Sequence, residues 1–441
     1  MGRGSINTTL GIVLAAGSFV AATQAEAGGF ALREQSTIGL GMAFAGAAAG
    51  SAGLSSMFWN PAIATMYPGW NGEQSFTLIA PYAKVTTSFS AIPAMFGDAG
   101  NISQTAVLPS GAGSIQITDR LFLGLVTGAP YGLVTKPNDV WQGELYGRSS
   151  RVTSFNATPS VAYKINDWIS VGAGLQIQYF KTTLNSALPL TANPATYPSL
   201  RLEGDNVGVG FTAGVTLTPM VGTTVGLGYR SSIRHELSGN AGAASPFTPL
   251  TPIKATIDTP DMVTLGISQV ITDRFTLSGG VEWTNWSRFG SFPVYNRNTS
   301  GAYTVLGNPI TLSFRFKDSW YFSLGGAYKL DPNWTVRAGL GYEISPIQDE
   351  NRPIRLPDSN RFHVALGASY QWNDRLSFDV GYAHLFTDGA KIDIGPGHPA
   401  YNPAFGPYRG KAETHVDIVS VGLSYRFDSP FVKEKPLVRK F

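Results

Sequence analysis

The 441-residue sequence contains no cysteine, and only 14% of its residues are charged, well below the roughly 25% usual in globular domains. The absence of cysteine excludes disulfides and fits an exported protein that avoids them. Lys and Arg are spread along the chain, and the net charge is only +3, which argues against nucleic-acid binding. Beyond the N-terminus there is no apolar run of about 18 residues, so transmembrane helices are not expected.

The N-terminus has the pattern of a signal peptide. Arg3 precedes an apolar run from Leu10 to Val20, and Ala25-Glu26-Ala27 has the small-x-small pattern of a signal peptidase site. A short buried helix is the alternative interpretation. We expect residues 1–27 to be removed, which leaves Gly28 as the first residue of an exported protein.

From Gln74 onward, apolar residues alternate with Gly, Ser, Thr and Gln, as in strands with one apolar face. Short polar turns link the strand-like runs in pairs, and longer segments rich in Pro, Gly, Ser and Asn join the pairs. The turns are Thr118-Asp119-Arg120, Asn166-Asp167, Thr218-Pro219, Thr272-Asp273-Arg274, Asp331-Pro332-Asn333 and Asn373-Asp374-Arg375. Short turns at one end and long loops at the other are typical of an outer-membrane β-barrel.

Counting the strand-like runs gives an even number, as bacterial barrels of one chain require. They begin near Glu73, Ser110, Arg120, Val152, Trp168, Asn206, Gly222, Lys254, Phe275, Thr311, Trp334, Arg361, Leu376 and Lys411. The expected fold class is an all-β membrane protein, an antiparallel transmembrane β-barrel of about 14 strands. We expect it in the outer membrane of a Gram-negative bacterium.

Aromatic residues of the apolar parity lie near both ends of the strands, as in the two interfacial girdles of a membrane barrel. Near the short turns they are Phe122, Trp168, Phe275, Trp334 and Trp372. At the other end they are Tyr179, Tyr229, Trp283, Tyr342 and Tyr382. A soluble all-β protein would expose these rings to water, which disfavours that alternative.

A barrel of this size has a lumen too wide for wall side chains to fill. Residues 28–72 lack the period-two pattern, and their Gly/Ala-rich part, 39–53, can pack closely against other backbone. We therefore expect a hatch, or plug, at 28–72, a barrel at 73–427 and a charged tail at 428–441. Within the hatch, Asn60, Pro61 and Ala62 form a stiff joint with breakable polar contacts, and we interpret them as gating residues.

Five stretches resemble the FadL family of outer-membrane transporters for long-chain fatty acids and other hydrophobic compounds, and the resemblance extends over essentially the whole mature chain. The stretches are Gly28-Gly29-Phe30-Ala31-Leu32, Gly39-Leu40-Gly41, Asn60-Pro61-Ala62, Asp331-Pro332-Asn333-Trp334 with Arg337-Ala338-Gly339, and Leu356-Pro357-Asp358-Ser359-Asn360-Arg361-Phe362. The resemblance implies capture of ligand between the third and fourth outer loops, passage to an internal pocket, movement of the hatch and lateral exit through a gap at the third strand.

Carried onto this sequence, the resemblance places the third outer loop at 184–204 and the fourth at 237–253. Apolar residues in loops that would otherwise be polar are candidate ligand contacts: Leu188, Leu190, Tyr197, Leu200, Phe247, Leu250 and Ile253. The third strand, Arg120 to Thr127, runs into residues that interrupt strand pairing. The candidate lateral opening comprises Gly124, Gly128, Pro130 and Gly132.

Three cations could bind a ligand carboxylate: Arg315, Lys317 and Arg337. The alternative for each is a salt bridge with Glu282 or Glu343. An uncharged hydrocarbon would need no such cation, so a hydrocarbon or monoaromatic channel is a second interpretation. A water-filled porin or an adhesin are further alternatives, but a porin would lack the plug and an adhesin would have longer, more polar outer loops.

Catalysis has no support in this sequence. His363 and His384 lie on neighbouring strands with opposite parity, so they cannot bind one metal ion. Gly39-Leu40-Gly41-Met42-Ala43-Phe44 lacks the third glycine of a dinucleotide site, and no Ser–His signature is found. We expect no enzymatic activity, cofactor or metal. The expected partners are a hydrophobic small molecule, outer-membrane lipid and lipopolysaccharide, and the barrel assembly machinery, and we expect a monomer.

Overall fold

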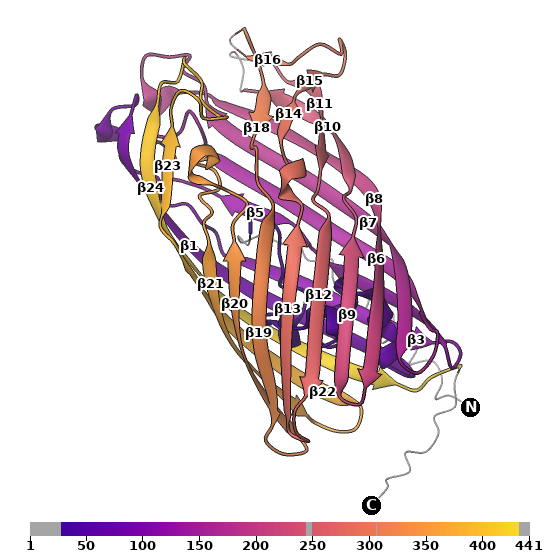
Figure 1. Ribbon diagram of the computed structural model, residues 1–441. Coiled ribbons are helices and arrows are strands. Elements are labelled where there is room, and N and C mark those ends of the chain that lie inside the picture. The colour runs from indigo at the N-terminus through magenta and orange to yellow at the C-terminus, as the bar shows by residue number, and fades with distance from the viewer. Residues whose placement is uncertain (1–27, 244–248, 306, 432–441) are drawn as a thin grey trace, which may run out of the picture.

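A computed structural model describes residues 28–243, 249–305 and 307–431 (Figure 1). The expected signal peptide, the candidate residue Phe247 and the last ten residues of the tail lie outside these ranges. Among the described residues, no helix is long and apolar enough to cross a membrane.

The chain forms a closed antiparallel barrel of 14 strands, which confirms the predicted fold class. Its first strand closes the barrel by pairing with both the second and the last, where Trp70 lies opposite Ile115 and Phe427. The strands are β1 (Trp70–Ser90), β3 (Ala106–Gln116), β4 (Leu121–Gly128), β6 (Ser149–Lys164), β7 (Ile169–Ala187), β8 (Ser199–Met220), β9 (Thr223–Arg230), β12 (Met262–Val270), β13 (Phe275–Thr284), β19 (Ser319–Lys329), β20 (Trp334–Ile344), β21 (Arg361–Gln371), β22 (Leu376–Thr387) and β24 (Tyr408–Phe427).

Shorter strands extend the wall or build the outer loops at the top of Figure 1. Those that extend the third, seventh and eighth barrel strands are β5 (Gly132–Thr135), β10 (Arg234–Gly242) and β11 (Thr251–Asp258). The others are β2 (Gly100–Asn101), β14 (Ser291–Pro293), β15 (Tyr295–Asn296), β16 (Thr304–Val305), β17 (Asn308–Pro309), β18 (Thr311–Ser313) and β23 (Ala390–Ile394). Short helical turns in these loops are η4 (Ala94–Phe96), η5 (Pro194–Thr196), η6 (Trp286–Arg288) and η7 (Asp349–Asn351).

Two predicted boundaries are wrong. The turn expected at Thr218-Pro219 is part of β8, and the chain reverses at Val221-Gly222, where Gly222 has a φ of 83° that glycine adopts without strain. The tenth barrel strand was expected from Thr311 but begins at Ser319. Its expected start belongs to β18, which pairs with β14 in an outer hairpin.

The outward aromatic residues follow the predicted girdles with one exception. Trp168, Trp334 and Trp372 are 42–63% exposed near the short turns, where a membrane interface favours them. Phe122, which was expected among them, is only 2% exposed. It lies one residue out of parity with outward-facing Leu123 and joins a buried cluster inside the barrel instead.

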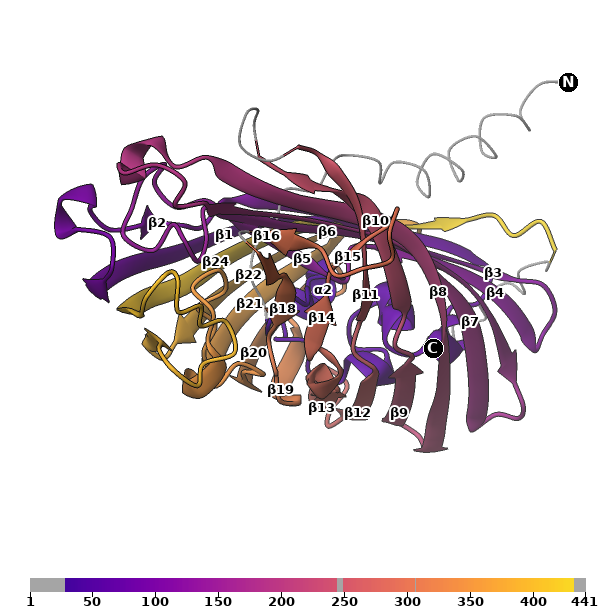
Figure 2. The same ribbon diagram turned by 90° about the horizontal axis from the view of Figure 1, so that it is seen from above.

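The hatch lies inside the ring of strands, where Figure 2 shows α2 surrounded by the wall. Its elements are α2 (Thr37–Leu40), η1 (Ala47–Ala49), η2 (Leu54–Phe58) and η3 (Pro61–Met66). Wall glycines let its backbone touch the sheet: a Cβ added to Gly228 would lie 1.7 Å from the Trp59 carbonyl oxygen, and one added to Gly226 would lie 1.8 Å from that of Ala48. A larger side chain at either position would push the hatch off the wall.

Candidate functional site

An apolar cavity lies in the outer half of the barrel, bounded by strands, outer loops and the start of the hatch. It contains about 900 Å³ of empty space, counting its open mouth. Its apolar lining includes Phe30, Leu133, Val152, Phe180, Leu184, Leu202, Leu237, Ile253, Ala255, Ile257, Phe289, Phe292, Val294, Leu312, Phe314, Phe316 and Leu356. A concave space of this size with few polar groups can take up a long apolar molecule.

A phenylalanine cluster from the segment between β13 and β19 covers one side of the cavity. The ring of Phe289 lies 4.7 Å from Phe292 and 5.4 Å from Phe316, between centroids, and 4.9 Å from Phe314. Sequence reasoning missed these residues because the alternation through Phe314 and Phe316 was assigned to a barrel strand. The signal was present, since the alternating rings mark one apolar face, but that face lines the cavity and not the membrane.

Phe30 of the hatch closes the inner side of this cavity. Its ring is 4.8 Å from Trp286 and 5.0 Å from Phe289, and it also contacts Tyr131 at 5.8 Å. Phe30 is 4% exposed. The start of the hatch therefore separates the cavity from Tyr131, which lies in the barrel wall.

The third barrel strand is broken at this point. β4 pairs with β6 up to Gly128 opposite Asn156, and β5 resumes the ladder at Gly132 opposite Thr153. Three residues, 129–131, therefore face two on β6. Pro130 lacks an N–H, so the ladder is interrupted where it lies.

The hatch occupies this break with its own backbone. The Leu32 N–H donates to the Pro130 carbonyl at 2.8 Å, and the Gly132 N–H donates to the Phe30 carbonyl at 2.8 Å. Below the break, Gly124 leaves room for the hatch, since an added Cβ would lie 2.3 Å from Cε of Met57. Withdrawal of the strand-like segment at Phe30–Leu32 would therefore unpair the wall beside the cavity.

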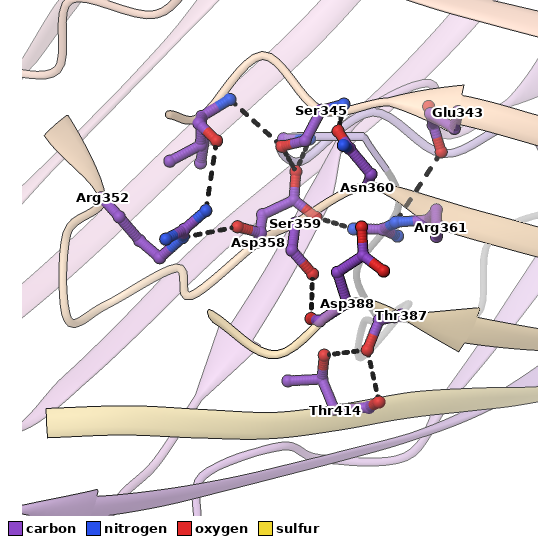
Figure 3. Close-up of polar contacts among 12 residues, drawn as sticks. Glu343, Ser345, Arg352, Asp358, Ser359, Asn360, Arg361, Thr387, Asp388 and Thr414 are labelled. Carbon is purple, nitrogen blue, oxygen red and sulfur yellow. Dashed lines mark hydrogen bonds and ion pairs between the residues drawn. The ribbon is translucent and has the colours of Figure 1, made fainter. Parts of the chain in front are cut away.

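A polar cluster in the stretch from Ser345 to Arg361 anchors the chain just before Phe30 (Figure 3). The Gly29 N–H donates to Oδ2 of Asp358 at 2.9 Å, and the Ser345 hydroxyl donates to the same oxygen at 2.6 Å. Arg361 forms an ion pair with Asp358, and Arg352 Nε donates to the Asp358 carbonyl at 2.8 Å. The stretch that resembled the family at the sequence level is thus the anchor of the hatch start.

Arg33 anchors the other side of Phe30. Its Nη2 lies 2.9 Å from Oε1 of Glu282 and 3.2 Å from Oε1 of Glu343, and its guanidinium carbon lies 3.8 Å from the ring centroid of Tyr321. The side chains of Arg33 and both carboxylates are at most 9% exposed. Buried ion pairs with this geometry specify one position for the hatch, because breaking either leaves a charge uncompensated.

Asn60 fastens the middle of the hatch to β8. Its Nδ2 donates to the carbonyls of Ala48 and Val215 at 2.8 and 3.0 Å and to Thr216 Oγ1 at 3.0 Å. Its Oδ1 accepts from the Ala62 N–H at 3.0 Å, which caps η3, with Pro61 in the first turn. The stiff joint expected from the sequence is therefore in contact with the wall.

Arg355 is a cation in the cavity lining that sequence reasoning missed. Nη1 donates to the Ser149 carbonyl at 2.9 Å and to Ser150 Oγ at 3.0 Å, and Nη2 donates to the Asn185 carbonyl at 2.8 Å and to Ser186 Oγ at 2.6 Å. All four acceptors are neutral, and Arg355 has no ion pair among the described residues. Burial lowers the pKa of Arg355 to about 10, so it stays charged at neutral pH. The sequence feature that could have identified Arg355 is a charged residue between two apolar ones, Ile354 and Leu356.

Of the predicted loop residues that the structure describes, only Ile253 lines the cavity, and two of them lie in strands. Leu188, Leu200 and Ile253 are buried in one cluster; Leu200 lies in β8 and Ile253 in β11, and Ile253 also lines the cavity. Tyr197 packs on a neighbouring cluster. Leu190 and Leu250 are 37% and 73% exposed, so they are open to an approaching ligand.

The three predicted carboxylate-binding cations lie away from the apolar cavity. Arg315 is exposed, with a φ of 53°, and Lys317 forms an exposed ion pair with Glu350 at 3.0 Å. Arg337 lines a polar space at the short-turn end with Glu73 and Asp379. None of the three is part of the cavity lining.

The two histidines face opposite sides of the wall, as parity predicts. His363 lies inside, with Nε2 3.6 Å from Oε2 of Glu343, whereas Nδ1 of outward-facing His384 lies 2.8 Å from Oδ1 of Asp417. Within residues 28–243, 249–305 and 307–431, no group of three or more His, Cys, Asp and Glu residues could hold a metal ion.

Known proteins share this architecture and its sequence pattern. Residues 18–427 match the family model described as "Outer membrane protein transport protein (OMPP1/FadL/TodX)". The long-chain fatty acid transport protein of Salmonella typhi is 27% identical over 414 residues, covering 87% of this chain and 93% of that protein. Outer membrane protein P1 of Haemophilus influenzae is 24% identical over 469 residues, covering 94% and 98%.

Two solved structures show the same fold. A Pseudomonas aeruginosa FadL homologue has a TM-score of 0.80 at 23% identity, covering 90% of this chain and 100% of that chain. The Ralstonia pickettii toluene transporter TbuX has a TM-score of 0.63 at 18% identity, covering 89% and 98%. At these identities the likeness shows the fold alone.

Proposed function

The chain belongs to the OMPP1/FadL/TodX family of outer membrane transport proteins, and from that premise we propose that its ligand is a long-chain fatty acid. The observation that carries the proposal is Arg355, a half-buried cation without a carboxylate partner among the described residues, on the wall of a mostly apolar cavity. The other charged residues of the lining are Lys254, which is exposed, and Glu203, which pairs with Arg201. A fatty acid supplies both the missing negative charge and a long apolar chain.

The head group would lie between Arg355 and Ser150. Both line the cavity, and Ser150 Oγ accepts from Arg355 at 3.0 Å, so its own O–H can donate to a carboxylate oxygen. The acyl chain would extend toward Phe30 and the phenylalanine cluster. Exit would follow withdrawal of Phe30–Leu32 from the break in the third strand, because that segment lies between the cavity and the gap.

An uncharged hydrocarbon is the second candidate ligand. The rings of Phe289, Phe292, Phe314 and Phe316 would suit a small aromatic molecule, and the solved relatives include a toluene transporter. A neutral ligand would leave the charge of Arg355 uncompensated in the cavity, which disfavours it.

The decisive experiment compares an acid with its uncharged analogue. We expect purified protein to bind oleic acid more tightly than oleyl alcohol, and Arg355→Gln to abolish the difference. A hydrogen bond to a charged group contributes about 1.5–3 kcal/mol, so acid binding should weaken by about 10- to 100-fold. Isothermal titration in detergent measures both ligands. Arg234→Gln, which removes an exposed arginine of β10, is the matched control.

Two results would contradict the proposal: equal affinity for acid and alcohol in the unchanged protein, or an acid preference that survives Arg355→Gln. Mass spectrometry of lipid that co-purifies with the protein gives an independent answer. Bound fatty acid supports the proposal, and recovery of only neutral hydrocarbons favours the second candidate.

The remaining partners belong to the same proposal. The family and the barrel place the protein in the outer membrane, where its outer face would contact lipopolysaccharide and its assembly would require the barrel assembly machinery. Phe427, which ends β24 and lies 4.6 Å from Trp70 between ring centroids, is the terminal aromatic residue of the last strand. A closed barrel leaves no strand edge for pairing with a second copy, which supports a monomer.

A further inference from the structure

Arg230, the last residue of β9, is buried and, like half-buried Arg355, has no carboxylate partner among the described residues. Only 5% of it is exposed. Nη1 donates to the carbonyl oxygen of Phe58 in the hatch at 3.0 Å, Nη2 lies 3.4 Å from Asn156 Oδ1, and its guanidinium carbon lies 4.0 Å from the ring centroid of Phe58. Both hydrogen-bond acceptors are neutral, and no ion pair to Arg230 is found in the part of the chain that the structure describes.

The other buried arginines at the hatch start are neutralised. Arg33 pairs with Glu282 and Glu343, and Arg361 pairs with Asp358. A ligand carboxylate would be repelled at those sites by the acids already present. Burying an arginine without an acid is costly, so Arg230 is the hatch contact whose charge a ligand anion would compensate.

The position of Arg230 connects it to the break in the wall. Asn156 is opposite Gly128 in the last pair of the β4–β6 ladder before the break. The Asn156 Oδ1 accepts from Thr158 Oγ1 at 2.6 Å as well as from Arg230, whereas its Nδ2 is buried without a hydrogen-bond partner. A buried cation and an orphaned amide donor therefore lie together where the third strand is interrupted.

We infer that Arg230 and Asn156 form a second carboxylate site at the break, and that the arriving carboxylate displaces the Phe58 carbonyl and so loosens the hatch. The inference rests on the proposed function, because it requires an anionic ligand. Charge-assisted hydrogen bonds are roughly twice as strong as neutral ones, so exchanging the Phe58 carbonyl for a carboxylate is favourable at Arg230. The same exchange at Arg33 would replace one carboxylate by another.

Photo-crosslinking tests the inference on the full-length protein. The probes are a long-chain fatty acid with a diazirine next to its carboxyl group and the matching fatty alcohol. We expect the acid to label peptides around Arg355 and also peptides containing Gly128, Asn156 and Arg230, and the alcohol to label the second set about tenfold less. In Arg230→Gln, labelling at the break should fall about tenfold while labelling around Arg355 persists.

The outcomes separate this inference from the proposed function. Acid labelling confined to the cavity, equal labelling of the break by acid and alcohol, or labelling of the break that survives Arg230→Gln would overturn the second site and leave the first intact. Failure of the acid to label either region more than the alcohol would refute the proposed function. If Arg230→Gln fails to assemble, the comparison of acid and alcohol labelling at the break in the unchanged protein still tests the second site. In addition, Arg230→Lys keeps the positive charge, so the inference requires that this variant retain the labelling at the break.

Discussion

Asn60 illustrates how one side chain can hold the hatch in the lumen. It is fully buried, and both its amide nitrogen and its amide oxygen form hydrogen bonds. The nitrogen donates to Ala48 of the hatch and to Val215 and Thr216 of the wall, and the oxygen accepts from Ala62 of the hatch. Replacement by alanine would leave buried carbonyls without a donor, and each lost hydrogen bond costs about 0.5–1.5 kcal/mol.

We expect Asn60→Ala to open the hatch more often and leave the barrel intact. A loss of about 3 kcal/mol corresponds to an increase of about 100-fold in the open population. Because the chain has no cysteine, a thiol introduced at buried Ala52 can report opening through its rate of reaction with a water-soluble maleimide. The rate should rise in Ala52→Cys/Asn60→Ala relative to Ala52→Cys alone.

The control for this experiment is Asn298→Ala, which removes an exposed asparagine side chain of an outer loop. It should leave the maleimide rate unchanged. Retention of the heat-resistant electrophoretic form shows that the barrel survives. Loss of that form in the Asn60 variant would show that the joint is required for assembly and not for gating.

At the scale of the element, the third strand depends on the hatch for its pairing. Where the β6 ladder is interrupted, the Pro130 carbonyl accepts from Leu32 and the Gly132 N–H donates to Phe30. Position 128 also contacts the hatch, since a Cβ added to Gly128 would lie 2.1 Å from Oε1 of Gln35. Residues of the hatch therefore fill the interruption in the third strand.

We expect replacement of Gly128-Ala129-Pro130 by Thr-Val-Thr to restore the ladder and close the gap, because β-branched residues favour pairing and the missing N–H returns. Uptake of radiolabelled oleate by cells should fall by about tenfold or more, with binding by the purified protein within about twofold of the original. Ala129→Ser, which keeps the proline and the glycine, serves as the control. Undiminished uptake by the triple variant would exclude lateral exit.

At the scale of the whole molecule, hatch and wall side chains pack together inside the barrel. The buried cluster that fills the lumen draws on both, with Leu40, Met57, Trp59 and Ile63 from the hatch and Ile79, Leu108 and Ile418 from the wall. We expect this cluster to block a water-filled path while the hatch is in place.

We expect the intact protein to show no steady ohmic conductance in planar bilayers, and a variant lacking residues 29–66 to conduct, because the lumen of a 14-stranded barrel is too wide for wall side chains to fill. Steady conductance by the intact protein would favour the porin alternative. If the shortened chain does not assemble, the conductance of the intact protein by itself decides between a closed barrel and a porin. A deletion of residues 298–301 in an outer loop is the control and should remain closed.

The sequence by itself determined the barrel, because period-two alternation and turn residues are local properties that each strand carries alone. It also predicted a plug at 28–72, since that segment lacks the pattern and needs a place to be buried, although the first barrel strand already begins at Trp70. Alternation does not say which surface an apolar face covers, so Phe122 and the rings at Phe314 and Phe316 were misassigned. Only the tertiary structure decided that Phe30 lies between the cavity and the wall break. It also decided that Arg355 and Arg230 have no acidic partner among the described residues. Charge compensation depends on neighbours hundreds of residues away, and closure of the barrel brings those neighbours together.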